Sequence, residues 1–180
     1  MQHKNIIITG ATDGIGLAAA KSIAKKGYHV SLVGRNSEKG KKALEAIIEH
    51  SGNENLDFFE CDLSLVANVK DLADRIKQKH SKIDVLLNNA GGANKTKQIT
   101  SEGLEKTFAT NQMNYFVLST ELLNIISESS DGRIVNVASN AHIGAEVDYE
   151  NINSEKSFSA WTSYCVSKLM NIMFTYQLSS

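Results

Sequence analysis

The feature that most constrains this chain is a glycine-rich segment between an apolar run and a helical pattern. Residues 6–8 are three consecutive isoleucines, and the segment 9–16 that follows them reads TGATDGIG. Apolar residues then recur at Ile15, Ala19 and Ile23, which is the spacing of one helix face. Glycines allow the backbone to turn tightly between two such elements. The segment therefore predicts a strand, a tight turn and a helix at the start of the chain.

The same alternation continues along the sequence. Further short apolar runs occupy 30–33, 56–59, 85–87 and 134–137, and helical patterns occupy 43–48, 69–76, about 101–127 and 160 to the end. Ser64 is the expected N-cap of the third helix. Continuous apolar strands separated by helices predict an α/β fold, a Rossmann-type doubly wound parallel sheet with helices on both faces. We expect one domain over 1–180, in which 140–158 forms a long functional or mobile loop.

Composition excludes several classes of function. The formal net charge is −1, which leaves no electrostatic footprint for nucleic acid. No apolar run reaches the length of a membrane span. Cys61 and Cys165 form no CxxC pair, which favours a reducing cytoplasm. The histidines show no metal-ligand spacing, so we expect no metal. Lys39 belongs to a lysine cluster that we interpret as a solvated helix face.

The glycine turn has the chemistry of a pyrophosphate site. Gly10, Gly14 and Gly16 permit a close backbone approach, and the helix that starts there presents free N–H groups and the positive end of its dipole. The intervening residues, Thr12, Asp13 and Ile15, are candidate contacts with the same ligand. The alternative interpretation is a strand–helix turn that binds nothing.

The spacing of these glycines resembles the motif of the short-chain dehydrogenase/reductase family. Two later segments strengthen the resemblance, because Asp62-Leu63 and Asn89-Ala90-Gly91 each follow a predicted strand, as in that family. The resemblance implies that Asp62 binds the adenine of a dinucleotide and that the small residues after Asn89 accommodate its ribose. Ligands of open α/β sheets bind beyond the carboxyl ends of the strands, where all these motifs fall.

The end of the second predicted strand bears on which dinucleotide is used. The acidic residue expected there is replaced by Gly34, and Arg35 follows it. A guanidinium suits a 2′-phosphate, so NADP(H) is favoured over NAD(H). Asp13 argues against this interpretation, because its carboxylate would repel a phosphate. The alternative for Arg35 is an ordinary surface arginine.

Tyr164 and Lys168 are the main catalytic candidates. They share a helix face at i and i+4, and a neighbouring ammonium favours the phenolate form of tyrosine, whose ordinary pKa is about 10. Such a pair also arises by chance on helix surfaces. The resemblance adds Ser139, which would bond the substrate oxygen, and Asn111, which would hold a water beside Lys168. Tyr164 and Lys168 are also expected to contact the cofactor.

The resemblance implies hydride transfer between NADP(H) and a carbonyl or alcohol carbon of a small, lipophilic substrate. The segments 139–142 and 164–174 are similar to the retinol-dehydrogenase-like branch. The competing function is a non-catalytic dinucleotide-binding module or an inactive fragment, because members of the family continue with further strands that are expected to be missing here. We expect a homodimer or homotetramer in the cytoplasm, without nucleic acid or membrane span.

Overall fold

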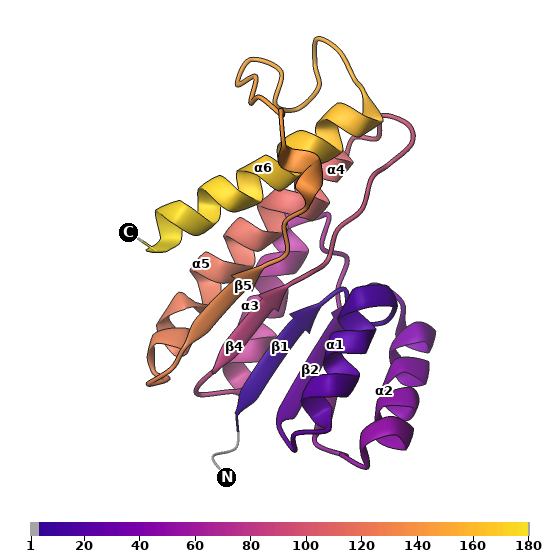
Figure 1. Ribbon diagram of the computed structural model, residues 1–180, viewed down its shortest axis with the longest axis vertical. Coiled ribbons are helices and arrows are strands. Elements are labelled where there is room, and N and C mark those ends of the chain that lie inside the picture. The colour runs from indigo at the N-terminus through magenta and orange to yellow at the C-terminus, as the bar shows by residue number, and fades with distance from the viewer. Residues whose placement is uncertain (1–3, 180) are drawn as a thin grey trace.

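The computed structural model describes residues 4–179 as a parallel sheet covered by helices (Figure 1). The strands are β1 (Asn5–Thr9), β2 (His29–Gly34), β3 (Leu56–Glu60), β4 (Val85–Asn88) and β5 (Arg133–Asn136). Their order is β3-β2-β1-β4-β5, and all neighbours are parallel. The chain reverses direction across the sheet after β3, which is the topology of a doubly wound fold and confirms the predicted fold class.

Helices cover both faces of the sheet. The long helices are α1 (Gly14–Ala24), α2 (Ser37–Ser51), α3 (Val66–Lys79), α5 (Asn114–Ser127) and α6 (Ala160–Ser179). One core cluster joins alternate strand residues such as Ile8 and Leu32 to α1 and α2, and a second joins Ile7 and Val33 to α3 and α5. Figure 1 shows the pairs α1–α2 and α3–α5 on opposite sides of the sheet. Burial on both faces explains the uninterrupted apolar runs of β1 and β2.

The predicted helix 101–127 is divided in the structure. It consists of α4 (Lys106–Phe108), a π-helical turn η1 (Ala109–Met113) and α5, whereas residues 101–103 form a turn. Asn114, the first residue of α5, donates a side-chain hydrogen bond to the carbonyl of Thr110. Periodicity in apolar residues does not distinguish an α-turn from a π-turn, and such turns often occur at functional sites.

The expected cap at Ser64 is wrong. Leu65 occupies the N-cap position of α3 and makes no side-chain capping bond, while Ser64 donates its hydroxyl to Asp62 at 2.8 Å. The carboxylate of Glu102 caps the helix instead, accepting from the amides of Val66 at 2.6 Å and Ala67 at 2.9 Å. A cap supplied from a distant loop leaves no local sequence signal.

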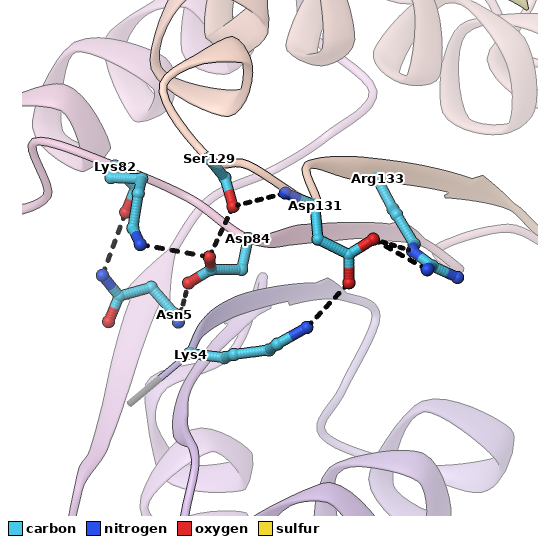
Figure 2. A network of polar contacts seen from close by, with 7 residues as sticks. All are labelled: Lys4, Asn5, Lys82, Asp84, Ser129, Asp131 and Arg133. Atoms are coloured by element: carbon cyan, nitrogen blue, oxygen red, sulfur yellow. Dashed lines mark hydrogen bonds and ion pairs between the residues drawn. The ribbon is translucent and has the colours of Figure 1, made fainter. Parts of the chain in front are cut away.

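Polar contacts join the amino-terminal ends of β1, β4 and β5 (Figure 2). The buried carboxylate of Asp84 accepts from the amide of Asn5 at 2.8 Å, the hydroxyl of Ser129 at 2.6 Å and the ammonium of Lys82 at 3.3 Å. Nearby, the exposed carboxylate of Asp131 accepts from Lys4 at 2.9 Å and also from Arg133. Every charge drawn in this network has a partner of opposite sign, so this end of the sheet is electrostatically satisfied.

The segment between β5 and α6 contains only a short 3₁₀ turn, η2 (Asn140–His142), which agrees with the predicted long loop. β5 forms one edge of the five-stranded sheet, and its residue Val135 is 44% exposed. Within residues 4–179, no helix combines the length and apolarity that a bilayer span requires.

Candidate active site

One large cavity runs along the carboxyl ends of the strands, with a volume of about 1110 Å³. Its walls come from the turns after β1, β2, β3, β4 and β5 and from α6. Nearly all of the predicted site residues line it, namely Gly10, Thr12, Asp13, Gly14, Ile15, Gly16, Arg35, Asp62, Leu63, Asn89, Ala90, Gly91, Ser139, Tyr164 and Lys168. Residues that are distant in sequence therefore meet at the edge where α/β sheets bind ligands.

The glycine turn is held against the end of β4 by side-chain hydrogen bonds. Asn89 donates its carboxamide to the carbonyls of Thr9 at 2.9 Å and Gly10 at 3.2 Å. The hydroxyl of Thr9 accepts from the amides of Asn89 at 2.9 Å and Ala90 at 3.0 Å. The carboxamide of Asn89 thus positions the turn, and Thr9 is a structural residue that the motif analysis missed.

Two glycines of the turn are required by close packing. A Cβ on Gly10 would lie 2.8 Å from the Cα of Ala90, at a backbone φ of 64° that glycine adopts readily. A Cβ on Gly16 would lie 2.3 Å from the carbonyl oxygen of Gly10. The turn therefore packs backbone against backbone, and the first amides of α1 lack intrahelical acceptors.

Asp13 is the N-cap of α1 and accepts from the amide of Gly14 at 2.7 Å. Its other carboxylate oxygen lies 4.0 Å from the ammonium of Lys39, and both side chains are largely exposed. Lys39 lines the cavity beside Arg35, so it contributes charge to the site as well as belonging to an exposed helix face. In the sequence, the signal that Lys39 could contribute charge here was its position in the first helical turn after Arg35.

The Asp62 carboxylate is stabilised in its charged form. Partial burial opposes ionisation, but hydrogen bonds from Ser64 and the charges of Lys106 and Arg35 outweigh it and hold the pKa of Asp62 below its usual value. Lys106 also lines the cavity and was not singled out from the sequence. Its contribution depends on the fold of the segment before α4, which has no motif of its own.

Helix α6 places Tyr164 and Lys168 on the face that borders the cavity. The ammonium of Lys168 lies 5.8 Å from the centre of the Tyr164 ring and donates to the carbonyl of Val137 at 2.9 Å. Lys168 is only 4% exposed. This burial lowers the pKa of Lys168 from 10.5 to about 8. The predicted proximity of the two side chains is confirmed, and the hydrogen-bond partner of Lys168 is a backbone carbonyl.

Ser139 follows β5 and precedes the short turn η2. Its hydroxyl accepts from the amide of Ala141 at 3.2 Å, which leaves the hydroxyl hydrogen free to donate into the cavity. The Nδ1 atom of His142 lies 2.6 Å from the carbonyl oxygen of Ser139, within hydrogen-bonding distance.

Asn111 differs from the other catalytic candidates because it does not line the cavity, although its neighbour Thr110 does. Its buried carboxamide accepts from the amide of Gly92 at 2.9 Å and donates to Gly92 at 3.0 Å and Ser167 at 2.9 Å. These bonds explain how an asparagine is tolerated within a helix. A Cβ on Gly91 would lie 3.1 Å from its Oδ1 and 3.4 Å from the Lys168 ammonium, so a larger residue there would press on the Asn111 side chain.

The fold and this cavity define an α/β protein of the doubly wound, nucleotide-binding class. The family model described as short chain dehydrogenase matches residues 4–180. The chain belongs to the short-chain dehydrogenase/reductase family.

Individual relatives agree with this assignment. The chain is 35% identical to human polyprenol dehydrogenase over 176 residues and 35% identical to human retinol dehydrogenase 11, covering 96% and 98% of itself. These matches span 53% and 55% of the two relatives, so the chain spans about half the length of the curated relatives it matches. An Escherichia coli CFT073 short-chain dehydrogenase structure with NADPH superposes with a TM-score of 0.80 at 27% identity, covering 99% of this chain and 71% of that one.

Proposed function

We propose that the protein is an NADP(H)-dependent oxidoreductase that transfers a hydride between the nicotinamide and a carbonyl or alcohol carbon of a lipophilic small molecule. One observation carries this proposal. Tyr164, Lys168 and Ser139, which lie on α6 and after β5, border the same cavity as the glycine turn after β1. A cavity of about 1110 Å³ has room for a dinucleotide and a substrate together.

The residues of the cavity suit a dinucleotide. The turn from Gly14 to Gly16 offers amides at a helix N-terminus for the pyrophosphate. Asp62, kept ionised, would accept a hydrogen bond from the adenine amino group, and the small residues Ala90 and Gly91 leave room for the ribose. When bound, the cofactor supplies or accepts the hydride.

The side chains of the chain itself would manage the proton. In the reducing direction, Tyr164 donates a proton to the substrate oxygen and Ser139 donates a hydrogen bond to the same oxygen, which stabilises the charge that develops there. Lys168 has three donor positions, of which one is used on Val137. The other two are available to the Tyr164 hydroxyl and to a ribose. Asn111, through its bonds to Gly92 and Ser167, keeps the loop and α6 aligned around Lys168.

The preference for NADP(H) rests on charge at the end of β2. Arg35 and Lys39 both border the cavity, while Gly34 stands where an acidic residue would exclude a 2′-phosphate. Asp13, the residue that argues against a phosphate, lies 4.0 Å from Lys39, which offsets its charge. The similar Escherichia coli structure with NADPH supports the same preference.

The substrate class follows from the named relatives, polyprenol dehydrogenase and retinol dehydrogenase, whose names give long apolar alcohols. The proposal therefore takes a lipophilic alcohol or its carbonyl as the substrate, without naming either compound for this protein. It also includes a homodimer or homotetramer and a cytoplasmic location, the latter supported by the free cysteines Cys61 and Cys165.

The decisive experiment compares Tyr164→Phe with Tyr176→Phe, a matched change at an exposed position of the same helix. NADPH binding is followed by fluorescence titration, and turnover by NADPH consumption with a panel of lipophilic aldehydes and ketones. We expect Tyr164→Phe to lose at least about 100-fold in kcat with NADPH affinity retained, and Tyr176→Phe to behave as wild type. Equal turnover in the two variants would refute the catalytic role. Wild-type binding without any turnover would identify the protein as a non-catalytic dinucleotide-binding module.

A further inference from the structure

Two histidines and an aspartate meet at the end of the sheet opposite the cavity. His29 is the first residue of β2, Asp57 is the second residue of β3, and His80 follows the last residue of α3. None of them borders the dinucleotide cavity. They are distant in sequence, so no spacing motif revealed them and the sequence analysis expected no metal.

Strand register explains why these side chains meet. Ser31 pairs with Asp57 between β2 and β3, and His29 precedes Ser31 by two residues, so all three side chains lie on one face of the sheet. This is the face covered by α3, because Val33 and Phe59 on the same alternation pack against that helix. The end of α3 then brings His80 over the two strand residues.

The potential ligand atoms are already close. The Nε2 atoms of His29 and His80 lie 2.9 Å and 3.8 Å from the same oxygen of Asp57, Oδ2. One donor atom from each of the three residues lies within 4.8 Å of the others. Zn–N and Zn–O bonds of about 2.0–2.2 Å place tetrahedral ligands about 3.3 Å apart, so movements of roughly 1 Å or less would complete the site.

The second carboxylate oxygen, Oδ1, accepts from Lys79 at 2.5 Å, which orients the carboxylate and leaves Oδ2 for the histidines. Metal-binding carboxylates are usually held by such outer hydrogen bonds. The hydroxyl of the fully buried Ser31 lies 3.4 Å from both Asp57 Oδ2 and His80 Nε2. The Ser31 hydroxyl is therefore an uncharged neighbour of the position where the two histidines and Asp57 meet.

The side chains offer the right chemistry and access. Burial, assisted by the charges of His29 and Lys79 and opposed by Asp57, lowers the pKa of His80. His80 is 5% exposed at its side chain, whereas His29 is 22% and Asp57 16% exposed, so an ion can enter from solvent on the strand side.

We propose that His29, Asp57 and His80 bind a zinc ion, with solvent as the fourth ligand. Two imidazoles and one carboxylate form a donor set typical of Zn²⁺, and imidazole disfavours the hard ions Mg²⁺ and Ca²⁺. The ion would tie β2, β3 and the end of α3 together. These are the strands whose opposite ends lead to Arg35 and Asp62 in the cavity.

The test titrates Zn²⁺ into chelator-treated protein by isothermal titration calorimetry. Wild type and His50→Gln, a change at an exposed histidine of α2, should bind one ion with equal affinity. His80→Gln and Asp57→Asn should each weaken binding at least about tenfold, a loss that second-shell changes alone can reach. Mg²⁺ and Ca²⁺ should give no saturable heat. Equal binding in wild type and His80→Gln, or no binding in wild type, would overturn the proposal and leave a hydrogen-bonded cluster without an ion.

A second measurement needs no substitution and so does not depend on how the variants fold. Imidazole ¹⁵N chemical shifts of the wild-type protein are recorded with and without one equivalent of Zn²⁺. We expect the Nε2 resonances of His29 and His80 to shift, and those of His50 and His142 to stay unchanged. Shifts confined to His50 or His142 would place the ion elsewhere and refute the site.

Discussion

The two ends of the sheet handle buried polar groups in opposite ways. At the amino end, Asp84 has amide, hydroxyl and ammonium partners, and Asp57 is shared between Lys79 and two histidines. At the carboxyl end, Lys168 is as buried as Asp84, yet its hydrogen bond goes to a neutral carbonyl. None of the ion pairs found among residues 4–179 includes Lys168.

Buried side-chain oxygens without a hydrogen-bond partner also differ between the two ends of the sheet. Within the described part of the chain, the buried side-chain oxygens without a partner belong to Asn88, Gln112, Asn114, Tyr115 and Asn171. They lie at the end of β4, around the π-turn and in α6. Burial, and then the phenol of Tyr164, raise the pKa of Tyr115 above its ordinary value. The amino end thus pairs its buried charges, whereas the carboxyl end keeps desolvated polar groups, of which Lys168 lines the cavity.

The largest effect is expected for Lys168→Met, which removes the unpaired buried charge at the carboxyl end of the sheet. We expect kcat to fall at least about 100-fold, since the cation beside Tyr164 is lost. We also expect the free energy of unfolding at pH 7 to rise by about 1–3 kcal/mol. A pKa lowered from 10.5 to about 8 corresponds to a cost of about 3 kcal/mol for the buried charge, part of which the bond to Val137 offsets.

The pH dependence of stability tests whether the buried Lys168 charge destabilises the folded protein. Between about pH 8 and 10.5 the unfolded chain keeps the Lys168 proton that the folded protein has released, so wild-type stability rises with pH in that window. Urea unfolding at several pH values should show the gap between wild type and Lys168→Met closing as pH rises. Lys70→Met, at an exposed position of α3, serves as the control. A variant less stable than wild type at pH 7 would contradict the assignment.

Asp84→Asn should lower the free energy of unfolding by about 2 kcal/mol, because hydrogen bonds to a charged group contribute about 1.5–3 kcal/mol. Burial opposes ionisation of Asp84, but bonds from Ser129, Asn5 and Lys82 hold its pKa below the usual value. Its stabilisation is therefore present above the ordinary carboxyl pKa and is lost as pH falls through the lower folded value.

The matched control is Asp131→Asn in the exposed part of the same network (Figure 2). Denaturant unfolding at pH 7 should show only a small change for this variant, because exposed ion pairs contribute little. Similar losses for the two variants would mean that burial does not distinguish the two carboxylates.

Arg35→Ala tests how much positive charge in the cavity contributes to nucleotide binding. Loss of a charged hydrogen bond to a 2′-phosphate should weaken NADPH binding by roughly 10- to 100-fold and leave NADH binding nearly unchanged. Fluorescence titration with both nucleotides measures the ratio, and Lys41→Ala, an exposed lysine of α2 outside the cavity, is the control. An equal effect on NADH would show that Arg35 does not read the phosphate.

The smallest effect is expected for Glu102→Ala. Removing the cap of α3 should cost about 1 kcal/mol in the free energy of unfolding, since two first-turn amides lose their acceptor. Thermal and urea unfolding both measure it. Ser64→Ala is the comparison, because Ser64 bonds Asp62 and does not cap the helix. A larger loss for Ser64→Ala would restore the original prediction of the cap.

Much of the site was predictable because its residues follow strands. Gly10, Asp62, Asn89 and Ser139 each end or follow a parallel strand, and parallel strands bring their carboxyl ends to one edge. Helix spacing likewise predicted that Tyr164 and Lys168 share a face. Glu102 lies in a turn and Lys106 opens the three-residue helix α4, and both were missed because no periodicity specifies the path of the chain between β4 and α5.

By itself, the sequence determined the order of elements, the sheet's parallel character and the candidate residues of the cavity, because local periodicity and glycine placement act over a few neighbouring residues. Only the tertiary structure decided which polar groups would be paired. The π-turn at Asn111, the carbonyl partner of Lys168, the cap from Glu102 and the meeting of His29, Asp57 and His80 all depend on contacts between distant segments. Such contacts follow from packing and strand register, which no short stretch of sequence encodes.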